Sequence, residues 1–350
     1  MPLRLAVRYS FLVPVLFSLA AISQTPNITS GHLDDPVVPP SPAAVYHDHS
    51  IHDIDAIGER NIGCGRGIGN WYSLERQVDM GKNYSNLVEA TSKPITDPLV
   101  TGYINQIGQN LVRNSDSLVP FTIKVLDSDD INAFALPGGF FYVDSGLILA
   151  ADNEAELAGV MAHEIAHVAA CHAARQRTRA KLMNMASVPL MMIGGPIGYA
   201  GYEALTIAMP ISNLKFSRRF ESEADYLGVQ YMYKAGYDPE ALTTFFEKVK
   251  AHEKGKQGAV AKAFRTHPQT PERIEKTQIE INTILPPRDE YKVDSSEFQE
   301  AKARLEARDN SRRFDRGKRD RPTLRRVSQP GIEKDLKNSS ASFDAIPAAN

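Results

Sequence analysis

The sequence has few of the features that would place it in several common classes of protein. It contains only two cysteines, Cys64 and Cys171, too few for the disulfide framework of a small secreted scaffold. Basic residues (40) almost balance acidic ones (42), so the net charge of −2 predicts no nucleic-acid partner. No internal repeat is visible. At 350 residues and 42% hydrophobic, the chain is still long enough to bury a substantial core.

Uninterrupted apolar runs long enough to cross a bilayer are also missing. The apolar stretch 11–22 follows Arg4 and Arg8, and small residues precede Gln24 at the −3 and −1 positions. This pattern is typical of a signal peptide over residues 1–23, with an uncleaved anchor helix as the alternative. We therefore expect an exported protein of the periplasm or cell envelope.

A second apolar stretch, residues 186–211, is broken by three prolines and four glycines. Exposed backbone has no hydrogen-bond partner in lipid, so a single membrane-spanning helix is disfavoured. The stretch is either a mobile lid over a functional site or a hairpin that dips into a membrane. The Arg-rich residues 310–326 are either a solubilising tail or a second contact with anionic lipid.

The pattern of composition predicts four regions. After the signal peptide, residues 24–60 are rich in Pro, Asp and His and predict a disordered linker. The folded domain is expected over residues 61–285. Residues 286–350 predict a helical extension followed by a disordered basic tail.

Apolar periodicity predicts a mostly helical α+β domain with a small sheet beside its central helix. Helices are expected from Ser73 onward, around Ile104, from a cap at Asp152 or Asn153, and over 214–236 and 238–252. Strands are expected at 121–126 and on both sides of a Pro-Gly-Gly turn within 131–143.

The central helix carries the sequence His-Glu-Ile-Ala-His, residues 163 to 167. Residues four apart on a helix differ by about 40° around its axis, so His163 and His167 can bind one metal ion. Glu164 is rotated by about 100° from His163, beside that metal. Zinc lowers the pKa of bound water to about 7, and Glu164 is then placed to take its proton.

A catalytic zinc ion needs a third protein ligand. Glu221 and Asp225 lie one turn apart in the segment 217–225, so Glu221 can bind the metal while Asp225 accepts a hydrogen bond from a ligating histidine. Glu223 is rotated by about 200° from Glu221 and should point elsewhere.

Cys171 is a further candidate ligand because it follows His167 by four residues. On a continuous helix, however, it lies about 6 Å beyond His167 along the axis, away from the metal. We therefore expect a buried structural thiol. Pairing with Cys64 is the alternative in an oxidising compartment.

Together these motifs give the chain a clear resemblance. The segments 132–143, 154–176 and 217–225, followed by Thr266-His267-Pro268 and Arg273, resemble the zinc metallopeptidases of the HtpX, BepA and CAAX-prenyl-protease type, the gluzincin family M48. The resemblance covers about residues 70–280. The integral-membrane relatives have several hydrophobic spans, which this chain lacks. The resemblance therefore favours the soluble, exported branch of the family.

The resemblance implies a role for each matching position. It implies one zinc ion per chain, held by His163, His167 and Glu221, with Glu164 as general base and Asp225 orienting a ligand. His267 and Arg273 would be catalytic, stabilising the oxyanion or occupying the fourth zinc position. An edge strand would bind extended polypeptide substrates through Asn132, Phe140, Phe141, Tyr142 and Val143.

The implied function is a zinc endopeptidase that acts on unfolded or misassembled envelope proteins. The alternative is a periplasmic chaperone that binds exposed strands with little turnover.

Overall fold

The computed structural model describes residues 47–183, 185, 216–253, 267 and 270–319. The expected signal peptide and the apolar stretch 186–211 lie outside these residues. Within the described part, no helix is long and apolar enough to cross a membrane.

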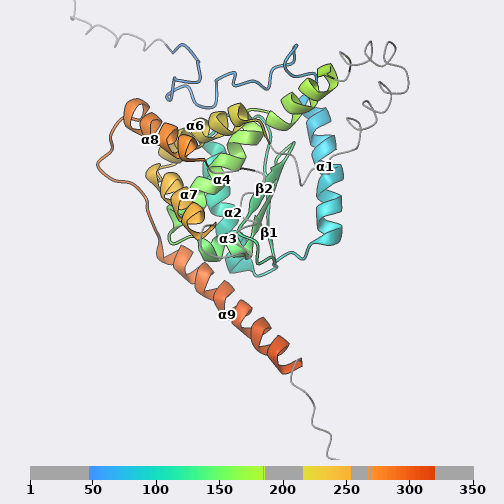
Figure 1. Cartoon of the computed structure of the whole chain (residues 1–350), viewed down its shortest axis with the longest axis vertical. Helices are drawn as coiled ribbons and strands as arrows, with labels where there is room; N and C mark the ends of the chain where they lie inside the picture. Colours follow the sequence, from blue (N-terminus) through green and yellow to red (C-terminus); the bar gives the residue numbers. More distant parts are fainter. Residues whose placement is uncertain (1–46, 184, 186–215, 254–266, 268–269, 320–350) are drawn as a thin grey trace, which may run out of the picture. The chain divides into compact units, whose positions relative to one another are not determined.

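Helices dominate the described chain, and three short strands form one sheet (Figure 1). A further helix over residues 172–183 follows α4. The labelled elements are α1 (Leu74–Thr91), α2 (Pro98–Arg113), β1 (Thr122–Leu126), β2 (Ala133–Leu136), β3 (Phe140–Asp144), α3 (Ser145–Ala150), α4 (Glu154–Ala169), α6 (Arg218–Lys234), α7 (Glu240–Glu253), α8 (Pro271–Ile284) and α9 (Ser296–Arg319).

The sheet has the strand order β1-β3-β2, with β1 parallel and β2 antiparallel to β3. The turn between β2 and β3 contains Gly138 and Gly139, whose φ angles of 79° and 89° suit glycine. Both expected strands on either side of this turn are present. The prediction of an α+β, mostly helical domain with a small sheet is confirmed.

Strand β3 is the central strand, so the prediction that residues 140–143 form an edge strand is wrong. Phe141 and Val143 face the main core, whereas Tyr142 packs in a second cluster with Leu126 and Leu136. A continuous apolar run is typical of a strand that is buried on both faces. The strand edge next to the central helix instead belongs to β2.

Helices cover both faces of this sheet. Helix α1 lies against one face, where its Tyr84 and Val88 contact the second cluster (Figure 1). Helices α2 and α4 pack on the other face and contribute most of their buried residues to the main core.

Helix α4 runs through the middle of the domain, and all of its residues are buried. Asn153 caps it by accepting a hydrogen bond from the Glu156 N–H at 3.0 Å. Helix α6 packs along α4 at Gly228, where an added Cβ would lie 3.3 Å from the His163 Cα. This close approach brings the first turns of α6 to the His163 face of α4.

Residues 47–60 pack against the domain and do not form the expected disordered linker. The buried Arg60 side chain pairs with Asp116 and donates to Gln230 Oε1 at 2.7 Å. Tyr231 also donates to Asp116, at 2.8 Å. A buried ion pair of this kind requires partners that are far apart in sequence, which local composition does not reveal.

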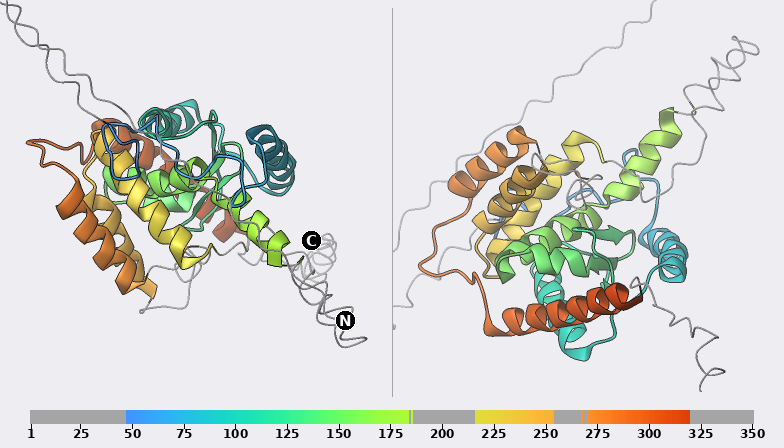
Figure 2. Two further views of the ribbon diagram at one scale, coloured as in Figure 1. Left: turned by 90° about the horizontal axis from the view of Figure 1, so that it is seen from above. Right: turned by 60° about the horizontal axis from the view of Figure 1, so that its bottom comes forward.

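The C-terminal helix also differs from expectation. Helix α9 continues to Arg319, although we expected disorder from about residue 310. Its Phe298, Ala301 and Leu305 are buried, and the helix packs on α2, which it crosses in the right-hand view of Figure 2.

Candidate active site

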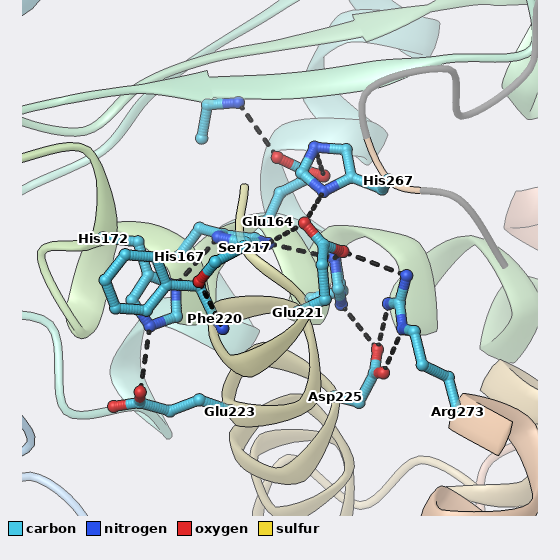
Figure 3. Close-up of polar contacts among 12 residues, drawn as sticks. Glu164, His167, His172, Ser217, Phe220, Glu221, Glu223, Asp225, His267 and Arg273 are labelled. Atoms are coloured by element: carbon cyan, nitrogen blue, oxygen red, sulfur yellow. Dashed lines mark hydrogen bonds and ion pairs between the residues drawn. The ribbon is translucent and has the colours of Figure 1, made fainter. Parts of the chain in front are cut away.

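Four side chains from three parts of the chain converge at the middle of α4. One potential ligand atom from each of His163, His167, Glu221 and His267 lies within 4.8 Å of the others, and all four residues are buried. Figure 3 shows His167, Glu221 and His267 turned toward one another. The Nε2 atoms of His163 and His167 are 3.1 Å apart. The two histidines therefore share one face of α4, as their spacing predicts.

Helix α6 supplies the carboxylate. Ser217 caps it through a hydrogen bond from the Phe220 N–H at 3.4 Å, which starts the helix one turn before Glu221. The two Glu221 oxygens lie 3.6 Å from His163 Nε2 and 3.7 Å from His167 Nε2. Two imidazole nitrogens and one carboxylate thus face a common point.

A carboxylate contacts His163 at Nδ1, the ring nitrogen that faces away from Glu221. Asp225 Oδ1 lies 2.9 Å from His163 Nδ1, one helical turn after Glu221, as the spacing predicts. Arg273 at the start of α8 holds Asp225 with two hydrogen bonds of 2.7 Å and lies 3.0 Å from Glu221 Oε2. These contacts indicate that Arg273 positions the two carboxylates, and a direct role on an oxyanion stays a prediction.

A different arrangement supports His167. Its Nδ1 lies 2.8 Å from Nδ1 of His172, a fully buried residue that we did not predict at the site. His172 Nε2 is turned toward Glu223 Oε2 at 3.6 Å. Arg175 fixes Glu223 with hydrogen bonds of 2.8 and 3.2 Å. Glu223 points away from the cluster, as its place on the helix implies.

Glu164 lies beside the cluster, between it and the edge of β2. Its Oε2 accepts a hydrogen bond from the Ala135 N–H at 3.3 Å, and its Oε1 is 3.4 Å from His267 Nε2. The carboxylate is therefore next to the converging ligand atoms and to the sheet edge.

His267 closes the cluster on the remaining side. Its Nδ1 is 2.9 Å from Glu221 Oε1, and its ring centre lies 5.3 Å and 4.9 Å from those of His163 and His167. The prediction that His267 comes close to the metal site is consistent with this position.

The surroundings of the two motif histidines shift their pKa values in opposite directions. Burial lowers the pKa of His163, but the neighbouring carboxylates of Asp225 and Glu221 outweigh it and raise that pKa to about 9. Burial holds the pKa of His167 well below 6.5. Burial also opposes the ionisation of Glu221, yet its histidine neighbours hold the pKa of this carboxyl well below its usual range.

The cluster fits a catalytic zinc ion. Two imidazole nitrogens and a carboxylate oxygen are a common donor set for catalytic zinc, which uses three protein ligands and one open position. Buried groups of this polarity are costly unless they are paired, and a cation between them would satisfy all three.

Cys171 is not the free thiol that we predicted. Helix α4 ends at Ala169, and Cys171 turns the chain with a φ of 52° before the next helix. The assumption of a continuous helix through Cys171 was therefore wrong. Cys171 forms a disulfide with Cys64, and their Cα atoms are 5.1 Å apart.

The residues predicted to bind substrate lie in β3 or, for Asn132, directly before β2, and most of them are buried. Tyr142 donates to Glu89 at 3.0 Å, and the Asn132 carbonyl accepts from the Asp144 N–H at 3.0 Å. Backbone groups alternate in direction along an antiparallel strand. Those of Ala133 and Ala135 therefore point away from β3, and Ala135 reaches Glu164. A small pocket next to His167, lined by residues including Ala135, Pro137 and Phe216, lies on this side.

Comparison with known proteins agrees with this site. Residues 98–280, more than half of the chain, match the family described as Peptidase family M48. The chain belongs to this family. The resemblance expected from the motifs is thereby confirmed.

Three relatives illustrate the similarity. The chain is 34% identical over 258 residues to the Beta-barrel assembly-enhancing protease of Escherichia coli (strain K12), covering 71% of this chain and 52% of that protein. It is 32% identical over 191 residues to the Metalloprotease LoiP of the same organism, covering 53% of this chain and 74% of LoiP. It is 31% identical over 179 residues to the Mitochondrial metalloendopeptidase OMA1 of Schizosaccharomyces pombe, covering 51% and 52%. The chain spans about half the length of the assembly-enhancing proteases that it matches.

Proposed function

We propose that this protein is a zinc metalloendopeptidase that hydrolyses peptide bonds of unfolded or misassembled envelope proteins. The observation that carries the proposal is the buried convergence of His163, His167 and Glu221, with Glu164 beside them and facing a sheet edge. Membership of a peptidase family supports the same reaction class.

His163, His167 and Glu221 would hold the ion, which when bound supplies a Lewis acid and lowers the pKa of water. Glu164 accepts a proton from the attacking water and passes it to the amine nitrogen that leaves. Its carboxylate is held for this by the Ala135 N–H at 3.3 Å. Asp225 and Arg273 keep His163 and Glu221 in position.

The substrate would bind as an extended strand along the edge of β2. The backbone groups of Ala133 and the carbonyl of Ala135 point away from β3, so they can pair with a peptide that runs past Glu164, whose carboxylate accepts the Ala135 N–H. Hydrogen bonds between backbones do not depend on side chains, which suits a broad range of unfolded substrates. This assignment moves the proposed substrate strand from β3 to β2.

The envelope location is also a proposal. Residues 1–23 have the pattern of a signal peptide. A relative named for β-barrel assembly supports a role in envelope protein quality control. Contact of residues 186–211 or the basic tail with a membrane surface stays a prediction.

The Glu164→Gln variant tests the reaction. It keeps the zinc ligands, so the purified variant should retain about one zinc ion per chain by elemental analysis and lose casein cleavage by about 100-fold or more. Equal cleavage by the variant and the wild type would contradict the proposal.

Among the described residues no strand pairs with the outer edge of β2, which also favours a second candidate function, an assembly factor that binds exposed strands without cutting them. In that case Glu164→Gln would still rescue a deletion strain under envelope stress. Failure to rescue, with the variant present at wild-type level, would contradict the assembly-factor function and favour the peptidase.

A further inference from the structure

The two histidines of the motif have different partners, and only the His163 side follows the expected pattern of a ligand held by a carboxylate. On the other side, His167 meets a second imidazole, that of His172, and the carboxylate of Glu223 lies behind it (Figure 3). We propose that His172 is a positioning residue, which fixes the tautomer and orientation of His167 and is itself oriented by Glu223 and Arg175. The inference rests on the proposed metal site.

The Nδ1 atoms of His167 and His172 are 2.8 Å apart, so one of them must carry the hydrogen. The Nε2 atom of His167 faces His163 and Glu221. An imidazole that offers a lone pair from Nε2 carries its hydrogen on Nδ1. His167 is then the donor, and Nδ1 of His172 is the acceptor.

This assignment fixes the tautomer of His172 as well. With Nδ1 accepting, a neutral His172 carries its hydrogen on Nε2, which is turned toward Glu223 Oε2 at 3.6 Å. Arg175 binds both oxygens of Glu223 and keeps the carboxylate in place. The charge of Glu223 thus favours the tautomer of His172 that can accept from His167.

The turn at Cys171, which follows the end of α4, makes the contact between His167 and His172 geometrically possible. On a continuous helix a residue five positions after His167 would be rotated by about 140° from it. Cys171 has a φ of 52°, a conformation that is uncommon for residues other than glycine, and its side chain is tied to Cys64. The turn directs His172 back toward His167.

Packing alone also offers an explanation, because the His172 ring stacks on Phe220 with centres 4.4 Å apart. Two substitutions separate the explanations. His172→Phe keeps a ring against Phe220 but removes the acceptor. His172→Asn loses the ring but keeps a polar atom near the position of Nδ1.

The measurement is the affinity of each purified full-length apoprotein for zinc, by competition with a chromophoric chelator. The cobalt(II) absorption spectrum is recorded as a second readout, with the melting temperature of each apoprotein. We expect His172→Phe to weaken zinc binding by about 10- to 100-fold and to alter the cobalt spectrum. His172→Asn should stay within about 5-fold of the wild type.

Equal affinity of His172→Phe and the wild type would overturn the proposal, as would a loss in His172→Asn as large as that in His172→Phe. Should His172→Phe not fold, Glu223→Gln carries the test, since it should weaken zinc binding by about 3- to 10-fold. Glu272→Gln, at an exposed ion pair with Lys276, is the matched control and should change nothing. Absence of zinc binding by the wild type would instead contradict the proposed function itself.

Discussion

The two sides of the candidate metal site hold chemically identical ligands in different ways. His163 meets a carboxylate directly at 2.9 Å, and that carboxylate is paired with a buried arginine. On its Nδ1 side, His167 meets a second imidazole at 2.8 Å, and the carboxylate of Glu223 lies one imidazole further away. The pKa of His163 is raised to about 9, whereas that of His167 is lowered.

The difference shows that one motif can draw its support from separate parts of the chain. The His163 side is assembled by α6 and α8 through Asp225 and Arg273. The His167 side depends on the turn after α4 and on the disulfide that anchors it. Changes on the two sides should therefore have separable effects.

The largest expected effect is on the His167 side, at the disulfide. Cys64 and Cys171 are 107 residues apart, so the bond restricts the unfolded chain strongly. The variant with both cysteines replaced by serine should lose about 2–4 kcal/mol of unfolding free energy in urea titrations. Wild-type protein treated with a reductant should lose a similar amount.

The same variant also tests the coupling to His172. If the disulfide acts on zinc binding through the turn, then adding His172→Phe should weaken zinc binding little further than either change alone. Additive losses would contradict the coupling. Unchanged stability in both the double serine variant and the reduced protein would contradict a structural role for the disulfide.

On the His163 side, Asp225→Asn should have the next largest effect. It removes the charge that holds His163 and leaves Arg273 with only part of its pairing, so zinc affinity should fall by about 10- to 100-fold. Chelator competition measures this loss. A loss of zinc affinity smaller than that of Glu223→Gln would contradict the expectation that the carboxylate on the His163 side contributes more to zinc binding.

Glu223→Gln should have a moderate effect with a defined pH dependence. Burial opposes its ionisation, but the nearby His172 imidazole and the hydrogen bonds from Arg175 lower the pKa of Glu223 from 4.5 to about 2. A depressed carboxyl pKa contributes stability that is present above pH 4.5 and lost as the pH falls toward 2.

The variant should therefore be about 1–2 kcal/mol less stable than the wild type at neutral pH. The difference should shrink in melting curves recorded at successively lower pH. A difference that grows on acidification would contradict the ion pair.

The smallest expected effect is at His267, which contacts both sides. Its ring lies beside His163 and His167, and its Nδ1 is 2.9 Å from Glu221. If this position keeps the site latent, His267→Ala should raise basal casein cleavage by about 3- to 10-fold, because more molecules would have an open site. Unchanged or abolished cleavage would count against an inhibitory role.

Local spacing was sufficient to predict the parts of the site that lie on regular helices. The four-residue spacings within α4 and α6 give His163, His167, Glu221 and Asp225 their shared direction. The apolar flanks of the motif likewise predicted a buried central helix.

Features that depend on where a helix ends, or on pairing between residues far apart in the sequence, could not be predicted from local spacing. No glycine or proline marks the turn at Cys171, so the sequence indicated a continuous helix and His172 was missed. The central position of β3 depends on pairing with two strands, which its apolar pattern alone leaves open. Residues 47–60 pack because Arg60 meets Asp116, 56 positions away.

Zinc-edge anomalous diffraction from crystals of the zinc-loaded Glu164→Gln protein would test the central claim most directly. We predict one strong peak per chain, bound by His163, His167 and Glu221, with His172 in contact with His167 and not with the metal. A peak elsewhere, or a metal bound directly by His172, would contradict the account.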